Sequence, residues 1–157
     1  MKTILLTVGK IDDATISQMI DIYVKRLSHY IPFDIEMISD VKNTKNLSEK
    51  DQKIQEGASI LKFLQPNDHV ILLDEKGKQL SSMEFARFIE KKSHTVAKRL
   101  VFVVGGPYGF SDEIYACANE KLSLSKMTFT HQMVRLVFVE QFYRAMTILN
   151  NEPYHHE

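Results

Sequence analysis

Residues 100–109, LVFVVGGPYG, join the most hydrophobic run of the chain to three closely spaced glycines. The uninterrupted apolar run 100–104 is typical of a strand that is buried on both faces of a parallel sheet. We therefore predict that it is a central strand. Gly105, Gly106 and Gly109 allow the backbone to approach a ligand closely or to adopt positive φ. Their spacing alone is equally compatible with a tight strand-to-helix turn that binds nothing.

Strand and helix patterns alternate on both sides of this stretch. Strands are expected at 3–8, 33–38, 69–73, 100–104 and 122–125, with an edge position for 33–38, a mobile loop at 39–47 and a charged turn at 74–78. Asp13, Ser48, Ser81 and Ser111 are placed to begin helices, and the longest helix is expected at 132–150. The pattern predicts an α/β protein with a mainly parallel sheet flanked by helices, in a single domain 1–157.

Composition narrows the function classes. The 157 residues carry 20 Lys and Arg against 20 Asp and Glu, a formal net charge of zero, so coating nucleic acid by charge alone is not expected. Cys117 is the only cysteine and no zinc-ligand spacing is present, so neither a disulfide nor a metal is expected. The short apolar run at the N-terminus matches neither a signal peptide nor a membrane span, which predicts a cytoplasmic protein.

Ligands of open parallel sheets bind beyond the carboxyl ends of the strands. Three predicted strand ends carry polar or glycine-rich residues, at 73–78, 105–109 and 125–131. The glycines follow the fourth strand rather than the first and do not match the GxGxxG dinucleotide fingerprint, and the Walker pattern is absent. Nicotinamide and nucleoside-triphosphate binding are therefore disfavoured.

The segment 122–135 places many polar side chains before the long helix, whose first N–H groups can hold polar ligand atoms. The alternative is a capping loop, with Thr130 as the cap and His131 as an ordinary surface residue. The long helix is apolar on more than one face, which favours a homodimer over burial within one chain. Such a dimer could order the C-terminal tail over its neighbour's pocket.

Four segments together resemble the ribosomal RNA large subunit methyltransferase H family, of the SPOUT or α/β-knot class. They are TILLTVGK, GGPYG, LSLSKMTFTHQMVRLVFVEQFYRA and NEPYHHE. The resemblance implies a trefoil-knotted fold and a homodimer that transfers methyl from S-adenosyl-L-methionine to N3 of a pseudouridine in a large-subunit rRNA hairpin of assembled ribosomes. It places the cofactor contacts on Leu73, Gly105, Leu124, Ser125, Lys126, Met127, Thr128 and Phe129.

Candidate catalytic residues follow from the chemistry of an N3–H group, which must lose its proton to become nucleophilic. His131 and His155 are the candidate bases because an imidazole titrates near cellular pH. Tyr154 could stack on the target base or bind it by a hydrogen bond.

Two arginines of the long helix are candidates for binding the RNA. Arg135 and Arg144 could bind phosphate or stabilise the anion, with ion pairs to Glu140 or Glu120 as the alternative. The paired histidines of the tail, His155 and His156, have no third ligand nearby in the sequence and make a poor metal site.

The chain departs from the family pattern at Thr130, where many relatives have Pro, and at His156, where they have a basic residue. The first departure is expected to loosen the loop before the long helix, and the second weakens a fixed contact of the tail with RNA phosphate. The rival functions are a SPOUT enzyme that modifies a tRNA ribose or another base, and a non-catalytic RNA-binding dimer module.

Overall fold

Five parallel strands form one sheet in the computed structural model, which describes residues 1–157. Their order across the sheet is β2-β1-β4-β3-β5. Their bounds are β1 (Lys2–Val8), β2 (Phe33–Ile38), β3 (His69–Gln79), β4 (Arg99–Val104) and β5 (Glu120–Ser123). The predicted class, the parallel sheet, the central place of 100–104 and the edge place of 33–38 are confirmed.

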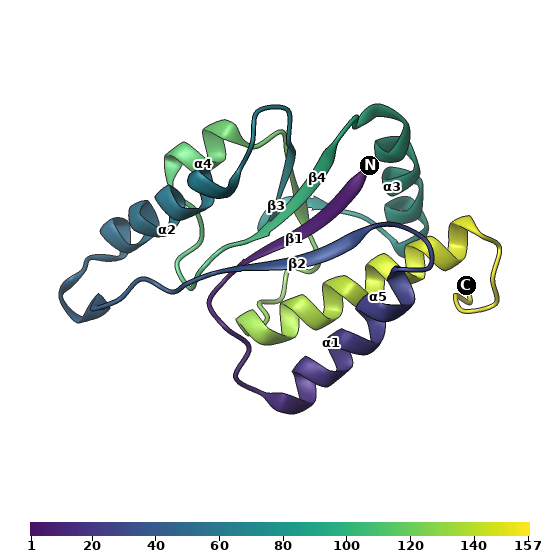
Figure 1. Cartoon of the computed structure of the whole chain (residues 1–157), viewed down its shortest axis with the longest axis horizontal. Coiled ribbons are helices and arrows are strands. Elements are labelled where there is room, and N and C mark those ends of the chain that lie inside the picture. The colour runs from purple at the N-terminus through teal and green to yellow at the C-terminus, as the bar shows by residue number, and fades with distance from the viewer.

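Helices cover both faces of this sheet (Figure 1). Their bounds are α1 (Ala14–Leu27), α2 (Glu49–Phe63), α3 (Ser82–Thr95), α4 (Asp112–Cys117) and α5 (His131–Leu149), with a short 3₁₀ helix η1 (Thr44–Asn46) before α2. The helices α1 and α3 pack on either side of α5 on one face, and α2 contacts α4 on the other. No helix combines the length and the apolar character that crossing a membrane requires.

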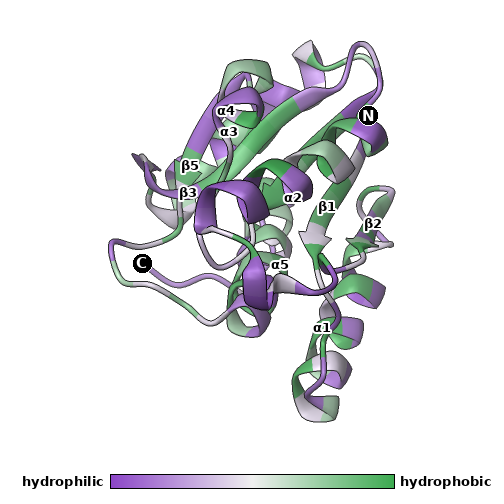
Figure 2. Cartoon of the chain, turned by 90° about the vertical axis from the view of Figure 1, so that its left-hand side faces the viewer, coloured by the Kyte–Doolittle hydropathy of each residue, from purple (hydrophilic) through white to green (hydrophobic).

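The central strand β4 shows why the sheet is buried on both faces. Leu100, Phe102 and Val104 belong to the apolar cluster under α1, α3 and α5, while Val101 and Val103 belong to the cluster under α2 and α4. All five are buried. Figure 2 shows the corresponding hydrophobic colour along the central strands. An apolar residue at every position is therefore required, because successive side chains point to opposite faces.

Three of the four predicted helix starts are confirmed by capping contacts, and the fourth by its position alone. Asp13 accepts hydrogen bonds from the N–H groups of Thr15 and Ile16, and Ser48 accepts one from Asp51. Ser81 and Glu84 form a reciprocal capping box at the start of α3. Ser111 precedes α4 but makes no capping hydrogen bond through its side chain.

The predicted charged turn at 74–78 is wrong, because β3 continues to Gln79. Pairing with β5 breaks after Leu73 and resumes at Lys78, and both residues face Leu122 across the irregularity. Gly77 permits this close approach, since a Cβ atom there would lie 2.6 Å from the carbonyl carbon of Leu122. The segment between the two paired regions bulges from the sheet and remains available to a site.

The elements around β5 start and end earlier than their sequence pattern suggests. α4 ends at Cys117 rather than near 120, and β5 runs from Glu120 to Ser123 rather than from 122 to 125. Asn119 fixes this position, because its backbone N–H donates to the Val70 carbonyl and its side-chain oxygen accepts from the Val70 N–H. Because β5 ends at Ser123, the segment 124–130 forms a loop before α5.

The topology places a crevice at the ends of β1 and β4. The chain leaves β1 toward the neighbouring edge strand β2, whereas it leaves β4 in the opposite direction toward β5. Connections that diverge from two adjacent parallel strands leave a gap beyond their carboxyl ends, where ligands of open α/β sheets bind.

Candidate active site

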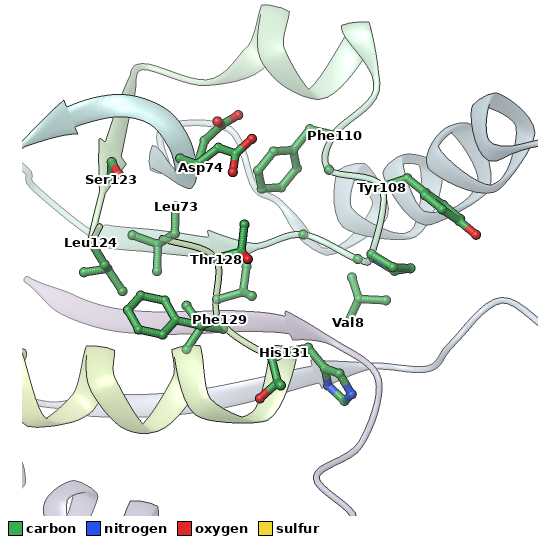
Figure 3. Close-up of a pocket in the computed structure, with 18 of the residues that line it drawn as sticks. Val8, Leu73, Asp74, Tyr108, Phe110, Ser123, Leu124, Thr128, Phe129 and His131 are labelled. Carbon is green, nitrogen blue, oxygen red and sulfur yellow. The ribbon is translucent and has the colours of Figure 1, made fainter. Parts of the chain in front are cut away.

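A cavity of about 1000 Å³ lies at the carboxyl ends of the strands. Its walls include the segment 73–76 in the bulge of β3, 104–110 at the end of β4 and most of 123–131 between β5 and α5 (Figure 3). The three segments that the sequence singles out therefore converge in one place, although the first is a bulge within β3 and not a turn after it. A cavity of this size lies within the usual range of small-molecule and cofactor sites.

The residues expected to hold the cofactor lie in this cavity with one exception. The lining includes Leu73, Gly105, Leu124, Ser125, Met127, Thr128 and Phe129. Lys126 does not line the cavity, and its side chain is exposed on the same loop. Several apolar members of this set face the cavity interior in Figure 3, among them Leu73, Leu124 and Phe129.

The glycine loop matches one of the two interpretations that its spacing leaves open, the tight turn, and it also lines the cavity. It makes a tight turn, with the Gly109 N–H donating to the Gly106 carbonyl and Gly109 at φ +83°. It also packs too closely for side chains: a Cβ atom at Gly105 would lie 3.1 Å from the Phe110 ring, and one at Gly106 would overlap the Glu56 carboxylate. Burial raises the pKa of Glu56, which lies behind this loop.

The loop 124–130 is held by short-range hydrogen bonds. The Ser123 hydroxyl donates to the Ser125 carbonyl, and the Ser125 hydroxyl accepts from the Met127 N–H. The Thr130 hydroxyl caps α5 by accepting from the Met133 N–H, as the capping alternative predicts. His131, in the first turn of α5, is exposed and lines the cavity.

Acidic side chains also line the cavity. They are Asp12, Asp40, Asp74 and Glu75, beside Lys10 and Lys76. The Tyr115 hydroxyl donates to Asp74, and burial together with this hydrogen bond raises the pKa of Tyr115. The apolar walls and the carboxylates suit a ligand that combines an apolar ring with positive charge. Asp74 and Glu75 belong to the segment 73–78 that the sequence singles out, whereas the sequence does not indicate Asp12 or Asp40 as cavity residues.

Arg135 is not placed for the RNA contact expected of it. Its side chain is 0% exposed and donates to the carbonyls of Val8 and Gly9, at 2.8 and 2.9 Å. Burial lowers its pKa, opposed by the negative charges of Asp40 and Asp12. Arg135 therefore fastens α5 to the end of β1 and supports the cavity wall from behind.

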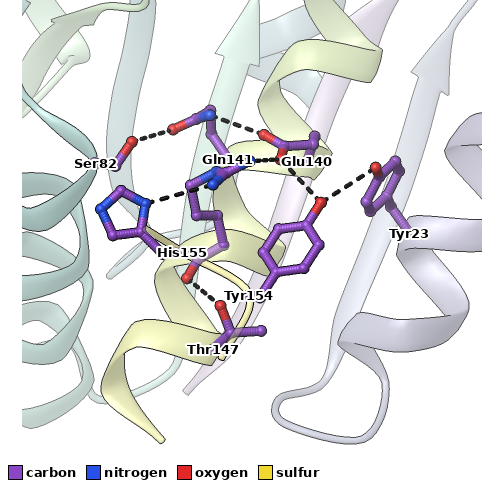
Figure 4. A network of polar contacts seen from close by, with 8 residues as sticks. Tyr23, Ser82, Glu140, Gln141, Thr147, Tyr154 and His155 are labelled. Carbon is purple, nitrogen blue, oxygen red and sulfur yellow. Dashed lines mark hydrogen bonds and ion pairs between the residues drawn. The ribbon is translucent and has the colours of Figure 1, made fainter. Parts of the chain in front are cut away.

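The C-terminal tail is anchored to its own chain by a polar network (Figure 4). Glu140 is its centre: it accepts hydrogen bonds from Arg144, from the Tyr154 hydroxyl at 3.0 Å and from Gln141 at 2.8 Å. Arg144 also stacks over the Tyr154 ring, at 4.8 Å from the ring centroid. The predicted ion pair between Arg144 and Glu140 is confirmed.

The same network orients His155 and constrains Tyr154. An Arg144 N–H faces Nδ1 of His155 at 3.4 Å, which leaves Nε2 directed elsewhere. Burial and the hydrogen bonds to Tyr23 and Glu140 raise the pKa of Tyr154. A phenol that donates to a carboxylate is a poor proton acceptor, so Tyr154 suits stacking or hydrogen bonding rather than the removal of a proton.

Two groups of candidate residues lie apart in one chain. His131 begins α5 beside the cavity, whereas Tyr154 contacts Glu140 at the middle of α5 and His155 contacts Arg144 beyond it. Glu140 follows His131 by nine residues, roughly 13 Å along the helix. Neither Tyr154 nor His155 lines the cavity of its own chain.

Comparison with known proteins adds to this geometry. The chain matches, over residues 1–155, the model of a family described as predicted SPOUT methyltransferase. The chain belongs to the SPOUT methyltransferase family. The trefoil-knotted α/β fold of SPOUT methyltransferases, rare among topologies, is therefore its fold, and the chain is a methyltransferase.

Curated relatives within the SPOUT methyltransferases cover nearly all of the chain. Proteins named ribosomal RNA large subunit methyltransferase H are 64% identical in Parabacteroides distasonis and 58% identical in Bacteroides thetaiotaomicron, each over 100% of both chains. One from Christiangramia forsetii is 58% identical over 97% of both chains. The family resemblance expected from the sequence is confirmed.

Proposed function

We propose that this protein transfers a methyl group from S-adenosyl-L-methionine to N3 of a pseudouridine in large-subunit ribosomal RNA of assembled ribosomes. The observation that carries the proposal is the convergence in one cavity of the bulge of β3 and the two loops that follow β4 and β5. Full-length relatives named as large-subunit rRNA methyltransferases support the choice of substrate.

The cavity fits this methyl donor. Leu73, Leu124 and Phe129 offer an apolar wall for the adenine ring, and the loop 124–130 offers backbone polar groups for its edge. The carboxylates of Asp12 and Asp74 suit the positive charges of the donor. When bound, S-adenosyl-L-methionine supplies a methyl group on a positively charged sulfur, which is already a good electrophile. The protein's task is then mainly alignment of donor and acceptor.

The acceptor nitrogen requires removal of its proton. His131 lies at the cavity and is one candidate base; His155 is the other. Arg144 and Tyr154 are positioned by Glu140 to stabilise negative charge on the flanking carbonyls and to stack on the target base. Each of these candidate side chains thus has one proposed task, and Arg135 supports the cavity wall from behind.

The site is complete only in a homodimer. A second copy with its α5 antiparallel to the first would bring Tyr154 and His155 of one chain to the cavity of the other. Half-exposed apolar side chains on α5, including Val134 and Val137, and exposed Met133 remain available for such a contact. The inner stripe of α5 packs into the core of its own chain. The remaining apolar side chains of the helix are then available for contact with the second copy.

Nucleoside analysis of ribosomal RNA tests the proposed reaction. Large-subunit rRNA from cells that lack this protein should lose one methylated pseudouridine, which returns when the protein is supplied. Mass spectrometry of digested nucleosides measures this directly. Loss of a methylated tRNA nucleoside instead would favour the rival SPOUT reaction, and no change in any nucleoside would favour a non-catalytic RNA-binding module.

Substitution of Gly105 should abolish donor binding. A Cβ atom at this position already lies 3.1 Å from the Phe110 ring, so the two methyl groups of Gly105→Val must displace that ring or enter the cavity. We expect at least a hundredfold weaker binding of S-adenosyl-L-methionine, about 2.7 kcal/mol, measured by calorimetry. Gly109→Ala is the control in the same loop, because a Cβ atom there meets nothing within 4 Å and its cost is confined to the backbone strain of φ +83°. Equal donor affinity in Gly105→Val and the native protein would contradict the assigned site.

A further inference from the structure

The segment 39–47 between β2 and α2, here named the lysine arm, projects from the body of the protein beside the cavity. Figure 1 shows it at the tip of the molecule beyond α2, and Figure 2, which faces this end, shows it as mainly hydrophilic. Val41 and Thr44 line the cavity, whereas Lys42 and Lys45 are exposed. The two lysines therefore lie at the cavity mouth and not inside it.

The positive charges at this mouth have no acidic partner. The ion pairs of the chain involve Lys2, His69, Lys92, Arg99 and Arg144, and none of these residues belongs to the arm. The one acid of the arm, Asp40, lines the cavity instead and packs against Gly9. A protein of zero net charge thus keeps free positive charge where a substrate must enter.

Two further lysines extend this charge around the opening. Lys10 lines the cavity after β1, and Lys126 is exposed on the loop that closes the opposite wall. Neither has an acidic partner within ion-pair distance. A ligand with several negative charges could therefore contact lysines on both sides of the entrance.

We propose that Lys42 and Lys45 bind phosphate groups of the RNA strand on either side of the target nucleotide. This inference rests on the proposed function. A base that enters the cavity leaves its polyanionic backbone at the mouth, where exposed ammonium groups gain from counterion release. Such contacts are independent of base sequence, so they position the strand while the cavity and the tail recognise the base.

Steady-state methylation of purified ribosomes tests the role of the arm. Lys42→Gln/Lys45→Gln should raise KM for ribosomes about tenfold, with kcat and donor affinity unchanged. The slope of log affinity against log salt should fall by about 1.4, since each phosphate contact on a single strand contributes about 0.7. The matched control is Lys91→Gln/Lys98→Gln, two exposed lysines at the end of α3 and before β4, which should behave like the native protein.

Several outcomes would overturn the inference. An unchanged KM and salt slope would show that the arm does not contact the substrate, and an equal effect of the control pair would show a general charge effect. A fall in donor affinity would place the lysines in the cavity. Photo-cross-linking from position 45 to a ribosomal protein instead of RNA would identify a protein partner. Failure of the proposed function is distinct, since the native protein would then not methylate ribosomes.

Discussion

Mixing a cavity variant with a tail variant should restore methyl transfer that neither variant shows alone. Gly105→Val removes donor binding, and Tyr154→Ala/His155→Ala removes the tail groups. Each homodimer is expected to have less than about 1% of native activity, because every site in it lacks one half. The restoration is expected because neither Tyr154 nor His155 lines the cavity of its own chain, which is lined by His131.

The expected size of the recovery follows from symmetry. After subunit exchange at equal concentrations, half of the dimers are mixed, and each mixed dimer has one site with an intact cavity and an intact tail. Activity should therefore return to about one quarter of the native value. The control is donor binding: the tail variant should bind S-adenosyl-L-methionine normally, which shows that its cavity is folded.

The alternative arrangement predicts a different result. If each chain completed its own site, the mixed dimer would hold one chain without a cavity and one without a tail, and no site would be intact. Activity that stays at the level of the separate variants, with mixed dimers verified by mass, would exclude the shared site. It would leave the methyltransferase assignment in place.

Gly77→Ala should destabilise the protein more than substitution of any other glycine. Its Cβ atom would lie 2.6 to 2.8 Å from the backbone atoms of Leu122, and the backbone of a paired strand cannot yield as a flexible side chain can. We expect the free energy of unfolding to fall by about 3 kcal/mol, at the upper end of the cost of overpacking, measured by urea denaturation.

Two further measurements serve as controls for Gly77→Ala. Gly109→Ala adds a Cβ atom in open space at φ +83° and should cost only about 1 kcal/mol from backbone strain. Donor affinity should also fall in Gly77→Ala, since displacement of Leu122 moves the neighbouring cavity residues Ser123 and Leu124. A change in unfolding free energy below 1 kcal/mol would show that β5 can shift without cost.

The fold class could be read from the sequence because its signals are local. The run at 100–104 is apolar at every position, and the capping residues Asp13, Ser48 and Ser81 contact N–H groups within three residues. The course of β3 past Leu73 could not be read in the same way. It depends on pairing with Leu122, and in isolation the charged residues after Leu73 resemble a turn.

The candidate site was predictable to a similar degree. The segment 73–76 lines the cavity as the bulge within β3 and not as a turn after it. The loops after β4 and β5 follow from the rule for parallel strand ends and need no long-range information beyond the sheet. The burial of Arg135, in contrast, cannot be predicted without long-range information. A helix that is apolar on several faces does not reveal which polar residue is turned inward, and only the packing of α5 against β1 decides it. The acids after β1 and β2 join the cavity for the same reason.

The order of the elements along the chain has a consequence for biosynthesis. The cavity needs Val8 from the first strand and Thr128 to His131 from the last fifth of the sequence, and Arg135 ties these two parts together. A nascent chain that has not yet emerged past this arginine has no complete cavity. The newly made polypeptide therefore becomes able to hold its methyl donor only after Arg135 has been synthesised and has packed against the first strand.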